Sequence, residues 1–506
     1  MRVPVTTSLT IEQFVAGQVT VKVSGTKNAV YGKRADGTVF ASQRPGVNIY
    51  EDASAASVTT GKGRGIYYWA AVGAKYFVNG ATVYKASYSA PLAATMTAGT
   101  DKVNFYEVGD NLVIIDTENN EGWYITSAAS TTLVSISDVD FPPNQTPALT
   151  LAHGGASLNG TLYVGCTNGE IWNSAVEDPT TWGIADFTSA EVSPDDGVAL
   201  YQHTDHIGFF GTKSLEFFYD NANPTGSPLN ARSDVVHEIG TINHDTVWAE
   251  FNTLYFVGQT PSGSLGVYVL TNFQVNKISN NDFDSLLTSA VITDNVEVFG
   301  SGFTAGGRSF YCLTLFNIGS GVVSTEATYV FDSSGVLGDW ELAYTDIDDM
   351  PLIGWTLATE TRAGEGILSN GDLVTINDDF NPQDTTEEQV YILADYFEPG
   401  YYTSTAADGD PIEMEIVLGQ GDSGTLETKF ADGLRVVATP TDASQLMTIQ
   451  WSDEGNNNYN TGRTIDLSNP KNRLNRCGSY KIRNYKLTYS GTENVEVEGL
   501  EMKVRA

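Results

Sequence analysis

The chain has 506 residues, long enough for more than one packed domain, and 41% of them are hydrophobic. Its 62 acidic residues against 27 basic ones give a formal net charge of −35, which disfavours binding of nucleic acid and other polyanions. The three cysteines are too few for a disulfide framework and lack the spacing of a zinc site, so we expect buried thiols in a reducing compartment.

Residues 1–45 are polar and contain short strand-like runs, so we expect an arm or a partner strand rather than a domain. The first residues have no apolar core of signal-peptide length. No run anywhere in the sequence approaches the length of a membrane span. We therefore expect a soluble protein that is made and assembled in a cytoplasm.

Residues 46–380 contain a series of paired short strands, each pair joined by a turn. Examples are GRGIYYWAAVGAKYFVNGATVYKAS from Gly63 and NFYEVGDNLVIIDTENNEGWYITS from Asn104. Apolar residues alternate in these runs, and Asn-Gly or Gly-Asp pairs punctuate them, which predicts β-hairpins. The units recur about every 40 to 50 residues, the spacing of propeller blades. We predict an all-β protein with a β-propeller of six or seven blades; a β-sandwich or β-helix array is the competing architecture.

The stretch HTDHIGFF places His203 and His206 three residues apart. On a single strand they would point to opposite faces, which suits a metal poorly, and we expect ordinary turn histidines. The aspartates of AADGDPIE lack a complete calcium-binding loop. We accordingly expect no bound metal and no cofactor.

Residues 381–410 are predicted to form an acidic connector. No Lys or Arg occurs between Arg362 and Lys429. The acidic residues at the start of this stretch include Asp378, Asp379, Asp384, Glu387 and Glu388.

Residues 411–506 contain five or six alternating runs, which predict a small antiparallel β-sandwich or barrel. This domain carries a basic stretch, formed by Arg463, Lys471, Arg473, Arg476, Lys481, Arg483 and Lys486. The interleaved tyrosines also occur in nucleic-acid-binding surfaces, but the acidic remainder of the chain opposes such binding. We favour docking to an acidic neighbour, including a second copy of the chain.

The segment WSDEGNNNYNTGRTIDL, residues 451–467, resembles the Ser-x-Asp-x-Gly-x-Thr-Trp turn of sialidase-type propellers. The spacing between Ser452 and Asp453 is one residue short of that motif. We expect Asp453 and Gly455 to fix a hairpin turn, because Asp and Gly are the residues that such turns require. A sialidase also needs a cluster of arginines, and arginines are sparse between residues 60 and 380. We therefore expect no enzyme activity, with a glycan-active or glycan-binding propeller as the alternative.

The order of several weak motifs resembles the packaged-DNA stabilisation proteins of short-tailed bacteriophages, also called tail nozzle or tail hub proteins. RPGVNIY is followed by KYFVNGATVYK, YVGCTNGEIWNSAVEDPTTW and IGFFGTKSLEFFYDNANPTGSPL, and then by WSDEGNNNY with RCGSYKIRNYKLTYSG. The resemblance covers roughly residues 45–504.

The resemblance implies a structural virion protein of the phage tail, assembled in the cytoplasm of a bacterial host. It implies a homohexameric ring below the portal adaptor ring, which extends the DNA exit channel, retains packaged DNA and anchors tail fibres or tailspikes. DNA would pass without sequence-specific binding. We hypothesise that Asp378, Asp379, Asp384, Glu387 and Glu388 line the channel, and that the basic stretch docks a subunit or the adaptor.

Overall fold

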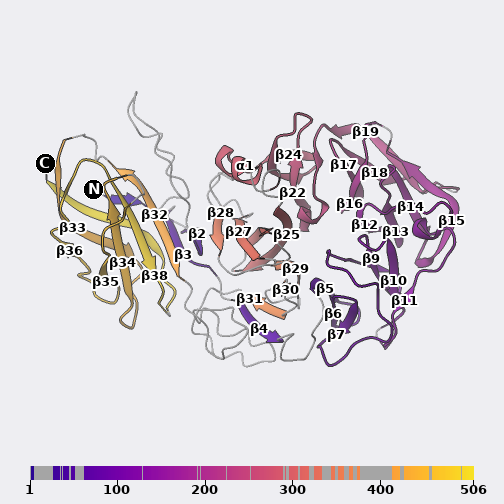
Figure 1. Cartoon of the computed structure of the whole chain (residues 1–506), viewed down its shortest axis with the longest axis horizontal. Helices are drawn as coiled ribbons and strands as arrows, with labels where there is room; N and C mark the ends of the chain where they lie inside the picture. The colour runs from indigo at the N-terminus through magenta and orange to yellow at the C-terminus, as the bar shows by residue number, and fades with distance from the viewer. Residues whose placement is uncertain are drawn as a thin grey trace.

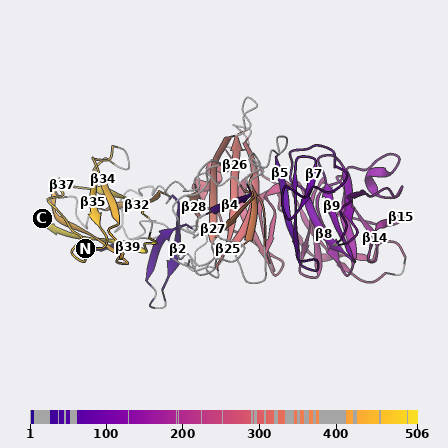
Figure 2. The same cartoon turned by 90° about the horizontal axis from the view of Figure 1, so that it is seen from below.

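The computed structural model describes residues 2–4, 27–51, 62–376 and 413–505, with short gaps inside the last three ranges. Almost all regular structure in this part of the chain is β. Figure 1 shows a ring of blades beside a smaller β-sandwich, and both ends of the chain lie in the sandwich. The second view places the sandwich beside the rim of the ring (Figure 2).

The described strands form seven blades. Blades 1 and 2 consist of β5 (Gly63–Trp69), β6 (Ala74–Asn79), β7 (Thr82–Lys85), β8 (Asn104–Val108), β9 (Asn111–Asp116), β10 (Glu121–Ile125) and β11 (Val134–Ser135), followed by η1 (Pro142–Asn144). Blades 3 and 4 consist of β12 (His153–Leu158), β13 (Thr161–Gly165), β14 (Glu170–Ala175), β15 (Asp178–Ser189), β16 (Gly197–His203), β17 (His206–Gly211), β18 (Leu215–Asp220) and β19 (Leu229–His237).

Blade 5 consists of β20 (Gly240–Thr241), η2 (His244–Thr246), β21 (Trp248–Glu250), β22 (Thr253–Gln259), β23 (Leu265–Thr271), β24 (Gln274–Lys277) and α1 (Asn281–Thr288). Blades 6 and 7 consist of β25 (Val296–Ala305), β26 (Arg308–Asn317), β27 (Ser324–Asp332), β28 (Tyr344–Ile347), β29 (Leu352–Leu357), β30 (Gly364–Leu368), β31 (Leu373–Ile376) and β4 (Val47–Glu51).

The predicted hairpins are present. The run from Gly63 forms β5, β6 and β7, and the run from Asn104 forms β8, β9 and β10. The turn between β12 and β13 shows how an Asn-Gly pair produces a hairpin. Asn159 and Gly160 both have positive φ, 52° and 78°. Asn and Gly tolerate this conformation, which matches the twist of the flanking strands.

The ring closes through strands from distant parts of the sequence. β4 pairs antiparallel with β31, with Ile49 opposite Val374, and becomes the outermost strand of blade 7. β29, the first strand of blade 7, lies next to β5, the first strand of blade 1, which completes the ring. The prediction of an all-β propeller is therefore confirmed, with seven blades.

The sandwich has two antiparallel sheets. One contains β1 (Arg2–Pro4), β2 (Ala29–Lys33), β3 (Val39–Gln43), β33 (Lys429–Ala438), β36 (Leu474–Asn475), β37 (Ser479–Tyr480) and β39 (Val497–Arg505). The other contains β32 (Met414–Gly421), β34 (Leu446–Ser452), β35 (Arg463–Asp466) and β38 (Arg483–Tyr489).

The described part of residues 1–45 supplies partner strands to the sandwich, one of the two expected roles, and does not form a separate arm. β1 pairs with β39, and Ala41 of β3 lies opposite Val497. Ala29 and Ala41 belong to the sandwich core, together with Leu434, Ile449 and Leu500. The propeller is thus inserted between two parts of the sandwich sequence, an arrangement that no local pattern in residues 1–45 could indicate.

All three cysteines are buried free thiols, as predicted. Burial raises the pKa of the Cys166 thiol to about 12, and the charge of Glu170 acts in the same direction. This thiol is therefore protonated and inert at neutral pH.

Candidate functional site

The predicted basic stretch divides into exposed and structural residues. Lys471, Arg473, Arg476 and Lys481 are exposed. They flank the short strands β36 and β37, which pair with β33. These four residues, called the basic edge below, are the part of the stretch that a partner can reach.

Arg483 is the buried member of the stretch, with a residue exposure of 2%. Its Nε and a terminal nitrogen donate to the two carboxylate oxygens of Asp453 at 2.6 and 2.8 Å. The guanidinium also lies over the ring of Tyr480, 4.5 Å from the ring centre. A buried guanidinium with a bidentate partner holds the protein together and is not available for docking.

This contact changes the interpretation of the segment WSDEGNNNY. Asp453 was expected to fix its own turn, but its carboxylate instead holds Arg483 of β38. The turn is stabilised by Ser452, whose Oγ accepts a hydrogen bond from the Glu454 N–H at 3.1 Å. Gly455 lies outside the described residues.

Arg463 and Lys486 also have partners within the sandwich. Arg463 donates to the Asn475 carbonyl at 2.9 Å, and Lys486 forms an ion pair with Glu415 at 3.0 Å. Both side chains are partly buried. They position loops and strands of this domain.

A shallow groove of about 430 Å³ adjoins the basic edge. It is lined by Gly433, Leu434, Arg435, Arg473, Glu501, Met502 and Lys503. A Cβ atom at Gly433 would lie 2.4 Å from Nε of Arg473, so the missing side chain lets the guanidinium cross the sheet here. Three cations and one carboxylate therefore line a surface on β33 and β39.

The predicted channel-lining residues Asp378, Asp379, Asp384, Glu387 and Glu388 lie outside the described residues.

The centre of the propeller is crossed by polar side chains. Lys102, just before β8 of blade 2, donates to the Gly300 carbonyl of blade 6 at 3.3 Å. Tyr201 of blade 4 donates to the His244 carbonyl of blade 5 at 3.2 Å. The first contact bridges blades 2 and 6, which are not adjacent, and the second joins the adjacent blades 4 and 5. Because side chains bridge the centre in this way, a DNA duplex cannot pass through a single propeller.

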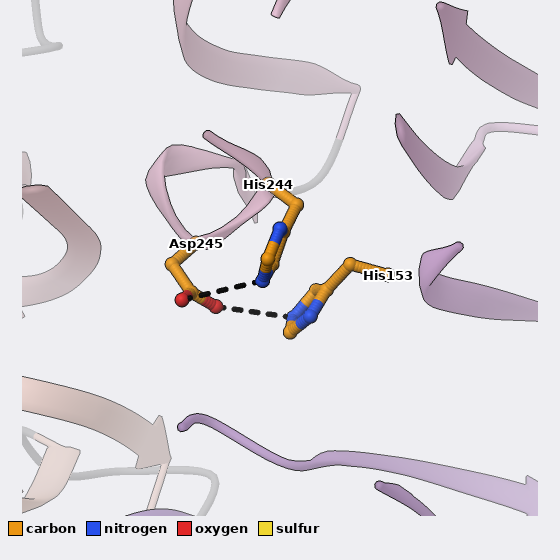
Figure 3. Close-up of side chains that lie close together, drawn as sticks. All are labelled: His153, His244 and Asp245. Carbon is orange, nitrogen blue, oxygen red and sulfur yellow. Dashed lines mark ion pairs between the residues drawn. The ribbon is translucent and has the colours of Figure 1, made fainter. Parts of the chain in front are cut away.

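His153, His244 and Asp245 form a compact group at this centre (Figure 3). His153 begins β12, while His244 and Asp245 form the start of η2 in blade 5. Asp245 Oδ1 lies 3.2 Å from His153 Nε2, and Oδ2 lies 3.4 Å from His244 Nε2. The two imidazole rings stack with centroids 3.8 Å apart.

Local features of the sequence fix these three side chains. Gly154 follows His153 with φ of 77°, and a Cβ there would lie 2.3 Å from the Leu200 carbonyl oxygen. Only glycine permits this close approach of β12 to β16. In blade 5, Asn243 caps η2 by accepting from the Asp245 N–H at 2.8 Å.

The protonation of His153 follows from its burial, since only 2% of the residue is exposed. Burial lowers the pKa of His153 well below the usual imidazole value, and a charge on His244 acts in the same direction. Burial alone would raise the pKa of Asp245, but the charges of the neighbouring histidines and of Lys102 lower it to about 2. An ionised Asp245 therefore needs positive charge beside it.

Sequence reasoning missed this group because no fixed spacing links its members. His153 and His244 belong to different blades, and only ring formation brings them together. His203 and His206 are not on one strand: they face each other across the hairpin of β16 and β17. Both pack against the ring of Phe273, with centroid distances of 5.1 and 4.7 Å.

No helix in the described part of the chain is long and apolar enough to span a membrane. No curated protein matches the chain. Among solved structures, it is similar to the N-terminal domain of Nup159, with 8% identity, coverage of 71% of this chain and 97% of that chain, and a TM-score of 0.38. BamB from Moraxella catarrhalis is 10% identical, with 72% and 98% coverage and a TM-score of 0.34. The extracellular domain of the hybrid two-component system BT4673 from B. thetaiotaomicron is 9% identical, with 88% and 58% coverage and a TM-score of 0.41.

The family described as "Bacteriophage P22 Gp10, beta-propeller" matches residues 30–315, which is more than half of the chain. The match begins in β2 of the sandwich, covers β4 and blades 1 to 5, and ends in β26 of blade 6. The chain therefore belongs to the bacteriophage P22 Gp10 β-propeller family.

Proposed function

We propose that this protein is a structural component of a short phage tail, with no catalytic role. In this proposal six copies form a nozzle ring below the portal adaptor, extend the DNA exit channel, retain packaged DNA until ejection and anchor fibres or tailspikes. The observation that carries the proposal is the family match over residues 30–315. Such a protein is assembled in the bacterial cytoplasm and resides in the virion.

The closed centre of the propeller supports a channel formed between copies. The contact between Lys102 and Gly300 joins blades 2 and 6 at 3.3 Å. A duplex cannot pass through a ring that is bridged in this way. If DNA passes this protein, it passes along a surface that several subunits share.

The charge of the chain supports passage without tight binding. A formal net charge of −35 repels the DNA phosphates and keeps non-specific affinity low. Under this proposal, the acidic residues between 376 and 415 contribute to the channel wall.

The basic edge is the proposed docking surface. Its four exposed cations are complementary in charge to an acidic surface of the adaptor or of the next subunit. Arg463, Arg483 and Lys486 are left out of this surface, because their side chains have partners within the sandwich.

The mass of the purified protein, measured by mass photometry alone and after mixing with the portal–adaptor complex, tests this function. We expect six copies to join each adaptor ring. Failure to bind the adaptor, together with hydrolysis of fluorogenic sialosides or signals on a glycan array, would favour a glycan-active or glycan-binding propeller instead.

A further inference from the structure

We propose that His153, His244 and Asp245 bind a divalent first-row metal ion of the zinc class at the centre of the propeller. Ligand atoms of the three side chains all lie within 4.8 Å of one another. Figure 3 shows one nitrogen of each imidazole beside the same carboxylate. The two rings stack with centroids 3.8 Å apart, so one ring has to turn for both nitrogen lone pairs to meet a single ion. Two histidines and one carboxylate are a common protein ligand set for zinc. This inference does not depend on the proposed tail function.

The separations between the ligand atoms fit a metal better than a direct ion pair. Zinc bonds of 2.0–2.1 Å in tetrahedral geometry place neighbouring ligand atoms about 3.3 Å apart. The observed separations are 3.2 Å for His153 and Asp245, and 3.4 Å for His244 and Asp245. A charge-assisted N–H···O bond would be shorter, about 2.7–2.9 Å.

The hydrogen bonds of His153 leave the correct nitrogen free of a proton. Its Nδ1 lies 2.9 Å from Oγ1 of Thr117, and its Nε2 lies 2.9 Å from the Asn104 amide nitrogen, which can only donate. Nε2 is therefore unprotonated, and Nδ1–H donates to Thr117. A histidine that binds metal through one nitrogen usually donates the other N–H in this way. Metal binding would take the Nε2 lone pair over from Asn104.

The carboxylate of Asp245 lacks a hydrogen-bond donor for one of its oxygens. Oδ1 is buried without a hydrogen bond, as is Nε2 of His244. Only 5% of the Asp245 residue is exposed. A buried oxygen that faces an unprotonated nitrogen is unfavourable unless a cation lies between them.

Two features decide how a metal would enter and what would oppose it. The His244 side chain is 32% exposed although its Nε2 is buried, so an ion would have to reach the group past this ring. The ammonium group of Lys102 lies in the same region and opposes a second cation electrostatically, but its hydrogen bond goes to Gly300 rather than to Asp245. A bound ion would join blades 3 and 5 directly.

Zinc titration of the full chain after EDTA treatment and dialysis tests the site. We expect one zinc ion per chain, and an affinity lowered at least about tenfold in Asp245→Asn and His153→Gln, as expected for loss of a ligand. His206→Gln is the matched control, because His206 also lies beside an aspartate, Asp205, at 2.6 Å. It should bind zinc like the wild type.

A measurement on the wild type avoids dependence on variants that fail to fold. X-ray absorption at the zinc edge should show nitrogen and oxygen ligands with scattering from two imidazoles, and EDTA should lower the melting temperature. No stoichiometric zinc, sulfur ligands, or equal losses in His206→Gln and Asp245→Asn would each overturn the proposal. In the first case the group is an ordinary buried ion pair.

Discussion

The propeller and the sandwich each bury an arginine, but they use their remaining charges differently. In the propeller, Arg64 of β5 pairs with Asp116 of β9, and both side chains are fully buried. Polar side chains at the centre join further blades. In the sandwich, Arg483 anchors the segment that contains Asp453, whereas the four residues of the basic edge remain exposed. The comparison suggests that charge in the propeller connects blades, while charge in the sandwich is partly left for a partner.

The largest expected effect on stability is at Arg64. Replacement by Met leaves Asp116 as an uncompensated buried charge, which costs about 3–5 kcal/mol of unfolding free energy. Arg435→Met is the control, because both side chains of the Arg435 pair with Glu501 are about half exposed and such a pair contributes about 1 kcal/mol or less. Chemical denaturation followed by tryptophan fluorescence measures both. Equal losses would show that the buried pair has no special role in joining blades 1 and 2.

A smaller loss is expected at Arg483 in the sandwich. Its partner Asp453 is 43% exposed and can be hydrated when the arginine is removed. Arg483→Met should therefore cost about 2 kcal/mol, the scale of a hydrogen bond to a charged group. The control Arg476→Met, on the basic edge, should change stability by no more than about 0.5 kcal/mol. If Arg483→Met did not change the free energy of unfolding, Arg483 would have no structural role and would again be a candidate docking residue.

Acid should destabilise the propeller before the sandwich, because all five histidines lie in the propeller. Burial lowers the pKa of His203, the charge of His206 adds to this, and Asp205 only partly opposes it. The unfolded chain then binds more protons than the folded one below pH ~6.5, so stability is full above that pH and is lost as the pH falls.

The expected loss is up to about 1.4 kcal/mol per pH unit for one such histidine. Hydrogen exchange between pH 7 and 5.5 can follow the two units separately. His203→Gln should reduce the slope for the propeller and leave the sandwich unchanged. Equal acid sensitivity of the two units would contradict this difference between them.

Reversing the charges of the basic edge should have the smallest effect on stability but a large effect on assembly. Arg473→Glu, Arg476→Glu and Lys481→Glu together should alter stability little, because exposed substitutions away from structural contacts typically change it by about 0.5 kcal/mol or less each. Binding to the adaptor should be lost, since like charges would now face each other. Normal tail assembly by the folded triple variant would rule out the basic edge as a docking surface.

The local features of the fold could be predicted from the sequence, and the long-range ones could not. Alternating apolar residues and turns such as Asn159-Gly160 specify individual hairpins, because these signals act over a few residues. The pairing of β4 with β31 and of β1 with β39 leaves no such local signal. The same limit applies to side chains. The charge of Arg483 is visible in the sequence, but its burial against Asp453 depends on how β34 and β38 pack, and His153 meets Asp245 only when the ring is complete.

A cryo-EM map of the protein assembled on the portal–adaptor complex is the most direct test of the central claim. The account predicts a ring of six subunits whose DNA channel lies between the subunits, while the centre of each propeller remains closed by the contacts around Lys102 and Asp245. A channel that runs through the propeller centres, or a protein that stays monomeric and unbound beside the adaptor, would contradict it.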